Sequence, residues 1–110
     1  MKNKPDFLEQ VYAIVERIPY GKVTSYGAIA RTIGAGKSAR LVGWAMSRAF
    51  TCDRDIPAHR VVNRNGLLTG KHHFGGENVM ADLLRQEGIE VENDKIVNFK
   101  KHFWQPGTKI

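Results

Sequence analysis

Two short amphipathic segments joined by a glycine-containing turn constrain the fold of this chain more than any other feature. The spacing of apolar residues predicts helices over residues 26–33 and 38–49, and Gly34 and Gly36 interrupt the pattern between them. A Thr-Ser pair just before the first segment supplies candidate N-cap residues. Two helices separated by so short a turn are typical of a helix-turn-helix motif.

Further elements surround this motif. Apolar periodicity predicts helices over residues 7–18 and 77–86. Short apolar runs on either side of Asn65-Gly66 and of Asn93-Asp94 predict two small β-hairpins, because such dipeptides favour tight turns between strands. The sequence therefore predicts one domain, residues 1–110, that is mainly α-helical with a small β-hairpin and resembles a winged helix-turn-helix.

The charge balance limits the partners and the compartment. Seventeen Lys and Arg against eleven Asp and Glu leave a net charge of +6, which suits a polyanion such as nucleic acid. The longest apolar run, residues 41–46, is far too short to span a bilayer, and residues 1–6 lack the apolar core of a secretory signal. The single cysteine, Cys52, allows no internal disulfide. We therefore expect a cytoplasmic protein without membrane association.

Two sequence features suggest a phosphate-binding loop and a metal site, but neither has the residues that such a site requires. Gly36-Lys-Ser38 lacks the upstream glycine of a phosphate-binding loop, because Arg31 stands at that position. The four histidines lack the spacing and the neighbouring ligands of a zinc site; they are His59, His72, His73 and His102. We expect neither a metal nor a cofactor.

The segment Ile56-Pro-Ala-His-Arg-Val-Val62 is the most informative part of the sequence. It resembles the active-site Pro-Cys-His-Arg-Val motif of the O6-alkylguanine-DNA alkyltransferases. Other motifs of that family follow in the family's order: Ile18-Pro-Tyr-Gly-Lys-Val-Thr-Ser-Tyr-Gly27, Ala39-Arg-Leu-Val-Gly43, Val61-Val-Asn-Arg-Asn-Gly66, Phe74-Gly-Gly76 and Gln86-Glu-Gly88. The resemblance covers about residues 7–106 and implies a winged helix-turn-helix-like domain of the alkyltransferase C-terminal type.

Ala58 departs from the family pattern, since it stands where the transferases carry their acceptor cysteine. Accepting an alkyl group requires a thiolate, and a methyl group has no lone pair to attack with. Cys52 lies six residues upstream, and nothing in the sequence indicates that it replaces the missing thiol. We therefore expect no enzyme activity. The chain looks like the alkyltransferase-like members of the family, which bind O6-alkylguanine in DNA without repairing it and pass it to nucleotide excision repair.

The resemblance also implies roles in DNA binding. Arg40 is similar to the family's arginine finger, which fills the space left by the flipped nucleotide, and a flat guanidinium suits that task. Tyr26 is similar to the tyrosine that crowds the phosphate of the target nucleotide. Ala39 and Gly43 are small, so the helix can lie close to DNA in the minor groove. With Ser25, these four residues make up the expected DNA-binding set.

The resemblance further implies a lesion pocket and a supporting relay. The backbone of Val61 is expected to read the guanine edge, and Phe74 and Gly75 to line the loop over the flipped base. The whole pocket set is Pro57, Ala58, His59, Val61, Phe74 and Gly75. His59, Arg60 and Glu87 match the relay that activates the cysteine in transferases; without a thiol, we expect them to hold the pocket in shape.

The leading hypothesis is a monomeric, non-enzymatic sensor whose partners are double-stranded DNA containing O6-alkylguanine and nucleotide excision repair proteins. Three alternatives remain open. The first is a helix-turn-helix DNA-binding protein without lesion preference. The second is an engineered Cys-to-Ala form of an active methylated-DNA-protein-cysteine methyltransferase. The third is an enzyme in which His59 acts as a base toward water.

Overall fold

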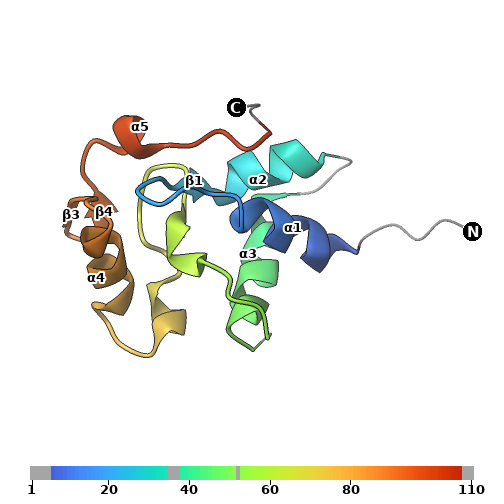
Figure 1. Cartoon of the computed structure of the whole chain (residues 1–110), viewed down its shortest axis with the longest axis horizontal. Coiled ribbons are helices and arrows are strands. Elements are labelled where there is room, and N and C mark those ends of the chain that lie inside the picture. Colours follow the sequence, from blue (N-terminus) through green and yellow to red (C-terminus); the bar gives the residue numbers. More distant parts are fainter. Residues whose placement is uncertain (1–5, 35–37, 52, 108–110) are drawn as a thin grey trace, which may run out of the picture.

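A computed structural model describes residues 6–34, 38–51 and 53–107 of the chain (Figure 1). Gly36 of the expected interhelical turn and Cys52 lie outside the described residues. Helices α1 (Phe7–Val15), α2 (Tyr26–Ile33) and α3 (Ala39–Ser47) gather on one side of the molecule, and α4 (Val79–Gln86) lies on the other (Figure 1). No helix within the described ranges is long and apolar enough to cross a membrane.

Side-chain caps explain where the three N-terminal helices begin. The residues before them, Asp6, Ser25 and Ser38, each accept a hydrogen bond from the backbone amide three positions later. Helix α2 has its predicted bounds and ends at Gly34, whose φ of 74° favours glycine. Helices α1 and α3 are shorter than predicted because their last turns tighten into hydrogen bonds between residues three apart; after α3 this turn is the 3-10 helix η1 (Arg48–Thr51).

The first predicted hairpin is wrong in its pairing. Strand β2 (Val61–Val62) pairs in parallel with β1 (Thr24–Ser25) rather than with the residues after Asn65-Gly66. The turn at Gly66 does form, but Leu67 bridges Lys95 instead. Both β2 residues are buried, on opposite faces, so this strand belongs between two packed layers and not in an exposed wing.

The second predicted hairpin is confirmed. Strands β3 (Val91–Glu92) and β4 (Lys95–Ile96) pair antiparallel around Asn93 and Asp94, whose φ values of 53° and 61° suit a tight hairpin turn. The remaining elements are the 3-10 helices η2 (Ala58–Arg60) and η3 (Lys71–Phe74) and the short helix α5 (Phe99–His102). Helix α4 begins two residues later than predicted.

Two hydrophobic clusters make up the core, and β2 lies between them. The first cluster joins α1, α2 and α3 and includes Ala58 and Val61. The second joins α4 with the β3–β4 hairpin and includes Val62. Phe74 packs against both clusters. The segment from η2 through β2 therefore runs along the seam of the molecule, with Ala58 at its start.

Candidate nucleic-acid interface and pocket

One cavity of about 400 Å³ brings together most of the expected DNA-binding residues and part of the expected pocket. It opens between α2, α3 and η3. The predicted DNA-binding and pocket residues that line this cavity are Tyr26, Ala39, Arg40, Gly43, Ala58 and Phe74. Its lining is completed by residues that were not predicted as site residues: Met46, Ser47, Phe50, Thr69, Gly70, His73 and Met80. The fold thus joins a helix-turn-helix surface to a hollow large enough for a nucleobase.

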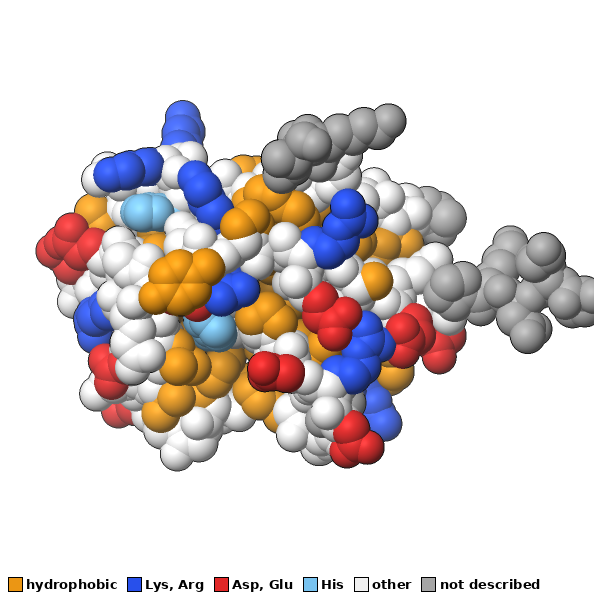
Figure 2. Space-filling view, in the orientation of Figure 1, with side chains coloured by type: hydrophobic (Ala, Val, Ile, Leu, Met, Phe, Trp, Pro, Cys, Tyr) orange, Lys and Arg blue, Asp and Glu red, His pale blue; other side chains and the backbone are white. Residues whose placement is uncertain are grey.

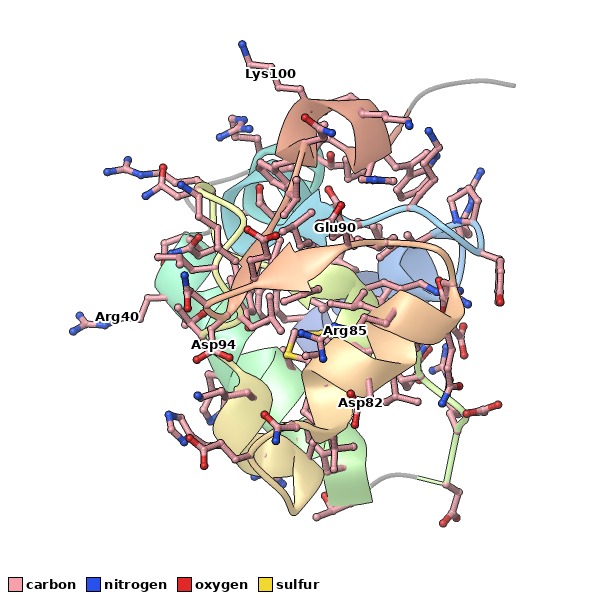
Figure 3. The ribbon with its side chains drawn as sticks, turned by 90° about the vertical axis from the view of Figure 1, so that its left-hand side faces the viewer. Arg40, Asp82, Arg85, Glu90, Asp94 and Lys100 are labelled. Carbon is pink, nitrogen blue, oxygen red and sulfur yellow. The ribbon has the colours of Figure 1, made fainter. Side chains whose placement is uncertain are left out.

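Arg40 projects from the rim of this cavity. It follows the first residue of α3, is exposed, and points away from the body of the molecule (Figure 3). Within the described part of the chain, its guanidinium has no hydrogen-bond or ion-pair partner. A cation held outward without a protein partner is available to an external anion or an aromatic base.

Tyr26 is the first residue of α2 and stands in the wall of the cavity. Burial raises the pKa of its hydroxyl, and a hydrogen bond with Thr69 offsets only part of this rise. A Cβ atom at Gly70 would lie 2.9 Å from the Tyr26 hydroxyl oxygen, so a larger residue just before η3 would displace the tyrosine or the backbone. The hydroxyl therefore remains protonated at neutral pH and can donate to a phosphate.

Ala58 lies in the wall between this cavity and a second one of about 480 Å³. Its residue surface is 9% exposed, and its side chain offers only a methyl group. Pro57 and His59 line the second cavity instead of the first, because a 3-10 turn points successive side chains in different directions. Val61 is buried in the core and, like Gly75, lines neither cavity.

Aromatic contacts close one end of the first cavity. The Phe50 ring of η1 stacks on His73 at 5.6 Å between centroids and meets Phe74 edge-on at 4.8 Å. These contacts tie η1 to η3 across the hollow, in geometries that favour aromatic pairs. Phe50 and His73 were not predicted as site residues. The only sequence signal for Phe50 was its place before a polar segment, and the only one for His73 was its place in a histidine pair within an expected loop.

The expected relay forms a compact cluster around Glu87. Its carboxylate accepts hydrogen bonds from His59 Nε2 at 2.6 Å, from Arg60 Nη2 at 2.9 Å and from the Gly21 amide at 2.8 Å. Arg60 Nη1 also donates to the Ile18 carbonyl at 2.9 Å. Burial raises the pKa of Glu87, but the bonds from Arg60, His59 and Gly21 outweigh it and hold the pKa below its ordinary value.

Ser25 and two basic residues lie beside the cavity. The Ser25 hydroxyl is buried and accepts the Ala28 amide at 3.1 Å as the N-cap of α2, so its visible role is to begin that helix. Arg31 and Arg64 line an adjoining hollow with Tyr26. The one sequence signal for Arg64 is its place beside the Asn-Gly turn that follows β2. These arginines extend the cationic surface beyond Arg40.

The opposite face of the molecule has a different character. Figure 2 shows acidic side chains around α1 on the face turned away from the Arg40 side of Figure 3. On α1 and just after it, Glu9 and Glu16 pair with Arg54 at 2.6 and 2.7 Å. Among the described residues, no three His, Cys, Asp or Glu side chains gather as a metal site. The charge distribution thus leaves the α3 side as the candidate nucleic-acid surface.

The chain is similar to known proteins over most of its length. Residues 6–89 match the family described as 6-O-methylguanine DNA methyltransferase, DNA binding domain. Alkyltransferase-like protein 1 of Schizosaccharomyces pombe is 36% identical, over 92% of this chain and 96% of its own. The DNA base-flipping protein of Escherichia coli is 34% identical, over 94% of this chain and 78% of its own.

A solved structure shows the same fold on DNA. The crystal structure of S. pombe Atl1 in complex with damaged DNA containing O6-carboxymethylguanine matches with a TM-score of 0.78 and 36% identity, covering 91% of this chain and 95% of that one. The mainly helical fold with its small sheets is therefore that of the family's DNA-binding domain. By sequence and by structure, this chain belongs to the 6-O-methylguanine DNA methyltransferase family, among its alkyltransferase-like, base-flipping relatives.

Proposed function

We propose that this chain is a non-enzymatic sensor of O6-alkylguanine in double-stranded DNA. It binds in the minor groove, rotates the damaged nucleotide into the cavity of about 400 Å³, and holds the lesion there. The observation that carries the proposal is that one cavity unites the outward arginine, the tyrosine and the alanine that replaces a nucleophile: Arg40, Tyr26 and Ala58.

Helix α3 makes the DNA contact in this proposal. Ala39 and Gly43 lie at the cavity rim with little side chain, and among the described residues a Cβ atom at Gly43 would meet nothing within 4 Å beyond its chain neighbours and the nearby backbone of its own helix. A small-residue surface lets the helix approach the floor of the groove. Arg40 then enters the base stack and fills the space that the rotated nucleotide leaves.

Tyr26 drives the rotation. Its protonated hydroxyl donates to the phosphate of the target nucleotide, and the ring crowds that phosphate outward. Phe74 lines the cavity and offers an aromatic surface to the flipped base. The lesion is thus read by its fit inside the cavity and not by sequence.

No bond to the alkyl group forms, because residue 58 supplies no nucleophile. The cluster of His59, Arg60 and Glu87 keeps the pocket in shape. The names of the relatives, alkyltransferase-like protein and DNA base-flipping protein, support this assignment.

The bound monomer then marks the site for nucleotide excision repair proteins. A recovery experiment tests this last step. Lesion-bearing DNA is incubated with repair proteins in the presence and absence of this chain, and we expect more of those proteins to be recovered on the DNA when the chain is present.

A binding titration tests the core of the proposal. Two identical duplexes, one with a single O6-methylguanine and one with guanine, are titrated at a stated moderate salt concentration, because phosphate contacts make affinity salt-dependent. We expect tighter binding to the modified duplex. Arg40→Ala should weaken that binding by about tenfold or more, and Arg40→Lys should recover little, since an ammonium keeps the charge but not the flat stacking surface.

The other outcomes separate the alternatives. Equal affinity for the two duplexes would put a plain helix-turn-helix DNA-binding protein in first place. Transfer of a labelled methyl group from DNA to the protein would overturn the non-enzymatic assignment. Appearance of an altered base after long incubation would favour hydrolysis assisted by His59.

A further inference from the structure

Trp44 is a large aromatic side chain left half exposed on the helix that carries Arg40. It is 50% exposed, while α3 packs its other side on the core. Arg40, Trp44 and Arg48 are spaced four residues apart, so they form one ridge along the outer surface at the C-terminal side of the interhelical turn. Core packing therefore does not explain why a tryptophan stands at this position.

Large exposed apolar side chains concentrate on this part of the molecule. Of the five recorded among the described residues, three lie on α3 and η1: Leu41, Trp44 and Phe50. Phe50 lines the cavity, but Trp44 does not. At about 100° per residue, Trp44 lies on the side of Arg40 away from the cavity-lining Gly43. Trp44 thus borders the point where Arg40 leaves the protein surface, outside the pocket itself.

The charges along the ridge favour a polyanionic partner. The Arg48 guanidinium carbon lies 5.6 Å from the centroid of the Trp44 ring, a cation–π contact that steadies the indole. Helix α3 contains no acidic residue, and no ion pair of Arg40 or Arg48 is recorded among the described residues. An aromatic ring between two unpaired guanidinium groups complements a nucleic-acid backbone.

We propose that Trp44 is a second DNA-inserting side chain, which packs its indole into the minor groove beside the site of the flipped nucleotide. Four helical residues rise about 6 Å, so with α3 along the groove Trp44 lies nearly two base steps, of about 3.4 Å each, from Arg40. Minor-groove proteins use apolar wedges in this way, with basic residues beside them. Arg48 contacts the adjoining phosphate. This inference rests on the docking of α3 in the proposed function.

The placement outside the cavity fixes what Trp44 contributes. It touches DNA that is present in both damaged and undamaged duplexes, so it raises affinity for both and leaves their ratio unchanged. Packing of an aromatic ring on bases is tolerant of sequence. Trp44 therefore prolongs each encounter of the protein with DNA, during which nucleotides are tested in the cavity, but it does not distinguish damaged from undamaged guanine.

The test combines affinity with fluorescence. We expect Trp44→Ala to weaken binding to the O6-methylguanine and the guanine duplex alike by about tenfold, and Trp44→Phe to lose less, since a smaller ring remains. Val79→Ala, which trims another exposed apolar side chain on α4, should change neither affinity. The chain has two tryptophans, and the quenching of indole emission on DNA binding should be largely lost in Trp44→Phe, which leaves Trp104.

Several outcomes would overturn the inference. Wild-type affinity of Trp44→Ala for both duplexes would do so, as would fluorescence quenching that persists in Trp44→Phe. Sedimentation showing that the wild type self-associates and Trp44→Ala does not would assign the ridge to a second copy of the chain. A wild type without lesion preference contradicts only the proposed function, because Trp44→Ala would still weaken both complexes.

Discussion

Residue 58 is an alanine whose surface is 9% exposed; it lies in the wall of the cavity, next in sequence to His59. His59 makes a 2.6 Å hydrogen bond to Glu87, and a histidine held by a carboxylate can act as the base that activates a neighbouring thiol. We predict that Ala58→Cys gains single-turnover methyl transfer: the thiolate bonds to the methyl carbon, the C–O bond breaks, and the guanine departs and takes up a proton. Incubation with labelled O6-methylguanine DNA should leave about one methyl group per protein.

Ala58→Ser is the matched control for this gain, because a hydroxyl of similar size is a far weaker nucleophile at neutral pH. The wild type and Ala58→Ser should both remain unlabelled. An unlabelled Ala58→Cys protein that still prefers the modified duplex would show that the bound alkyl group does not reach residue 58.

At the scale of elements, the Glu87 carboxylate ties three segments of the chain together. It follows α4 and takes hydrogen bonds from η2, through His59 and Arg60, and from the Gly21 amide before β1. Glu87→Gln keeps the size of the side chain but leaves the half-buried Arg60 guanidinium without its counter-charge. We predict a loss of about 1.5–3 kcal/mol in the free energy of unfolding, measured by urea titration.

The lowered pKa of Glu87 gives this loss a pH dependence. The carboxyl binds its proton more weakly in the folded chain, so its contribution to stability is complete above the unfolded pKa of about 4.3 and disappears as pH falls through the lowered folded value. The stability difference between wild type and Glu87→Gln should therefore shrink on acidification below about pH 4.3. A difference that stays constant down to strong acid would contradict the role of the ionised carboxylate.

Local signals account for the elements that the sequence predicts well. Helix α2 has its predicted bounds because Ser25 caps it and Gly34 ends it, both within one turn of the helix. The parallel pair of β1 and β2 has no such signal: each strand is two residues long and its partner is distant in the chain. Only the burial of Val61 and Val62 in separate clusters selects that pairing over the expected hairpin, and burial depends on the whole fold.

At the scale of the whole molecule, the difference between local signals and long-range contacts also explains which site residues could be predicted. Ala58 and Phe74 line the cavity as expected, and Tyr26 and Arg40, which were expected on the DNA-binding surface, line it as well. All four were predicted from the family resemblance of their local motifs. Phe50 and His73 reach the cavity only because η1 and η3 meet across it, a contact between segments that no local pattern links. Pro57 and His59 turn to the second cavity because η2 is a 3-10 turn, which the sequence did not predict.

The distribution of charge over the molecule yields a last prediction, at Arg64. This exposed arginine follows β2 and lines the hollow that adjoins Tyr26 and Ala39, so the proposed docking places it near a phosphate outside the lesion pocket. Arg64→Ala should weaken binding to damaged and undamaged duplexes equally, and the slope of log affinity against log salt should fall by about 1, because one fewer phosphate is neutralised. Arg85→Ala removes the same charge from α4, where Arg85 lies near Asp82 (Figure 3) and donates to it at 3.2 Å, and should leave the slope unchanged. Equal changes of slope in both variants would mean that net charge alone, and not a contact at Arg64, sets the salt dependence.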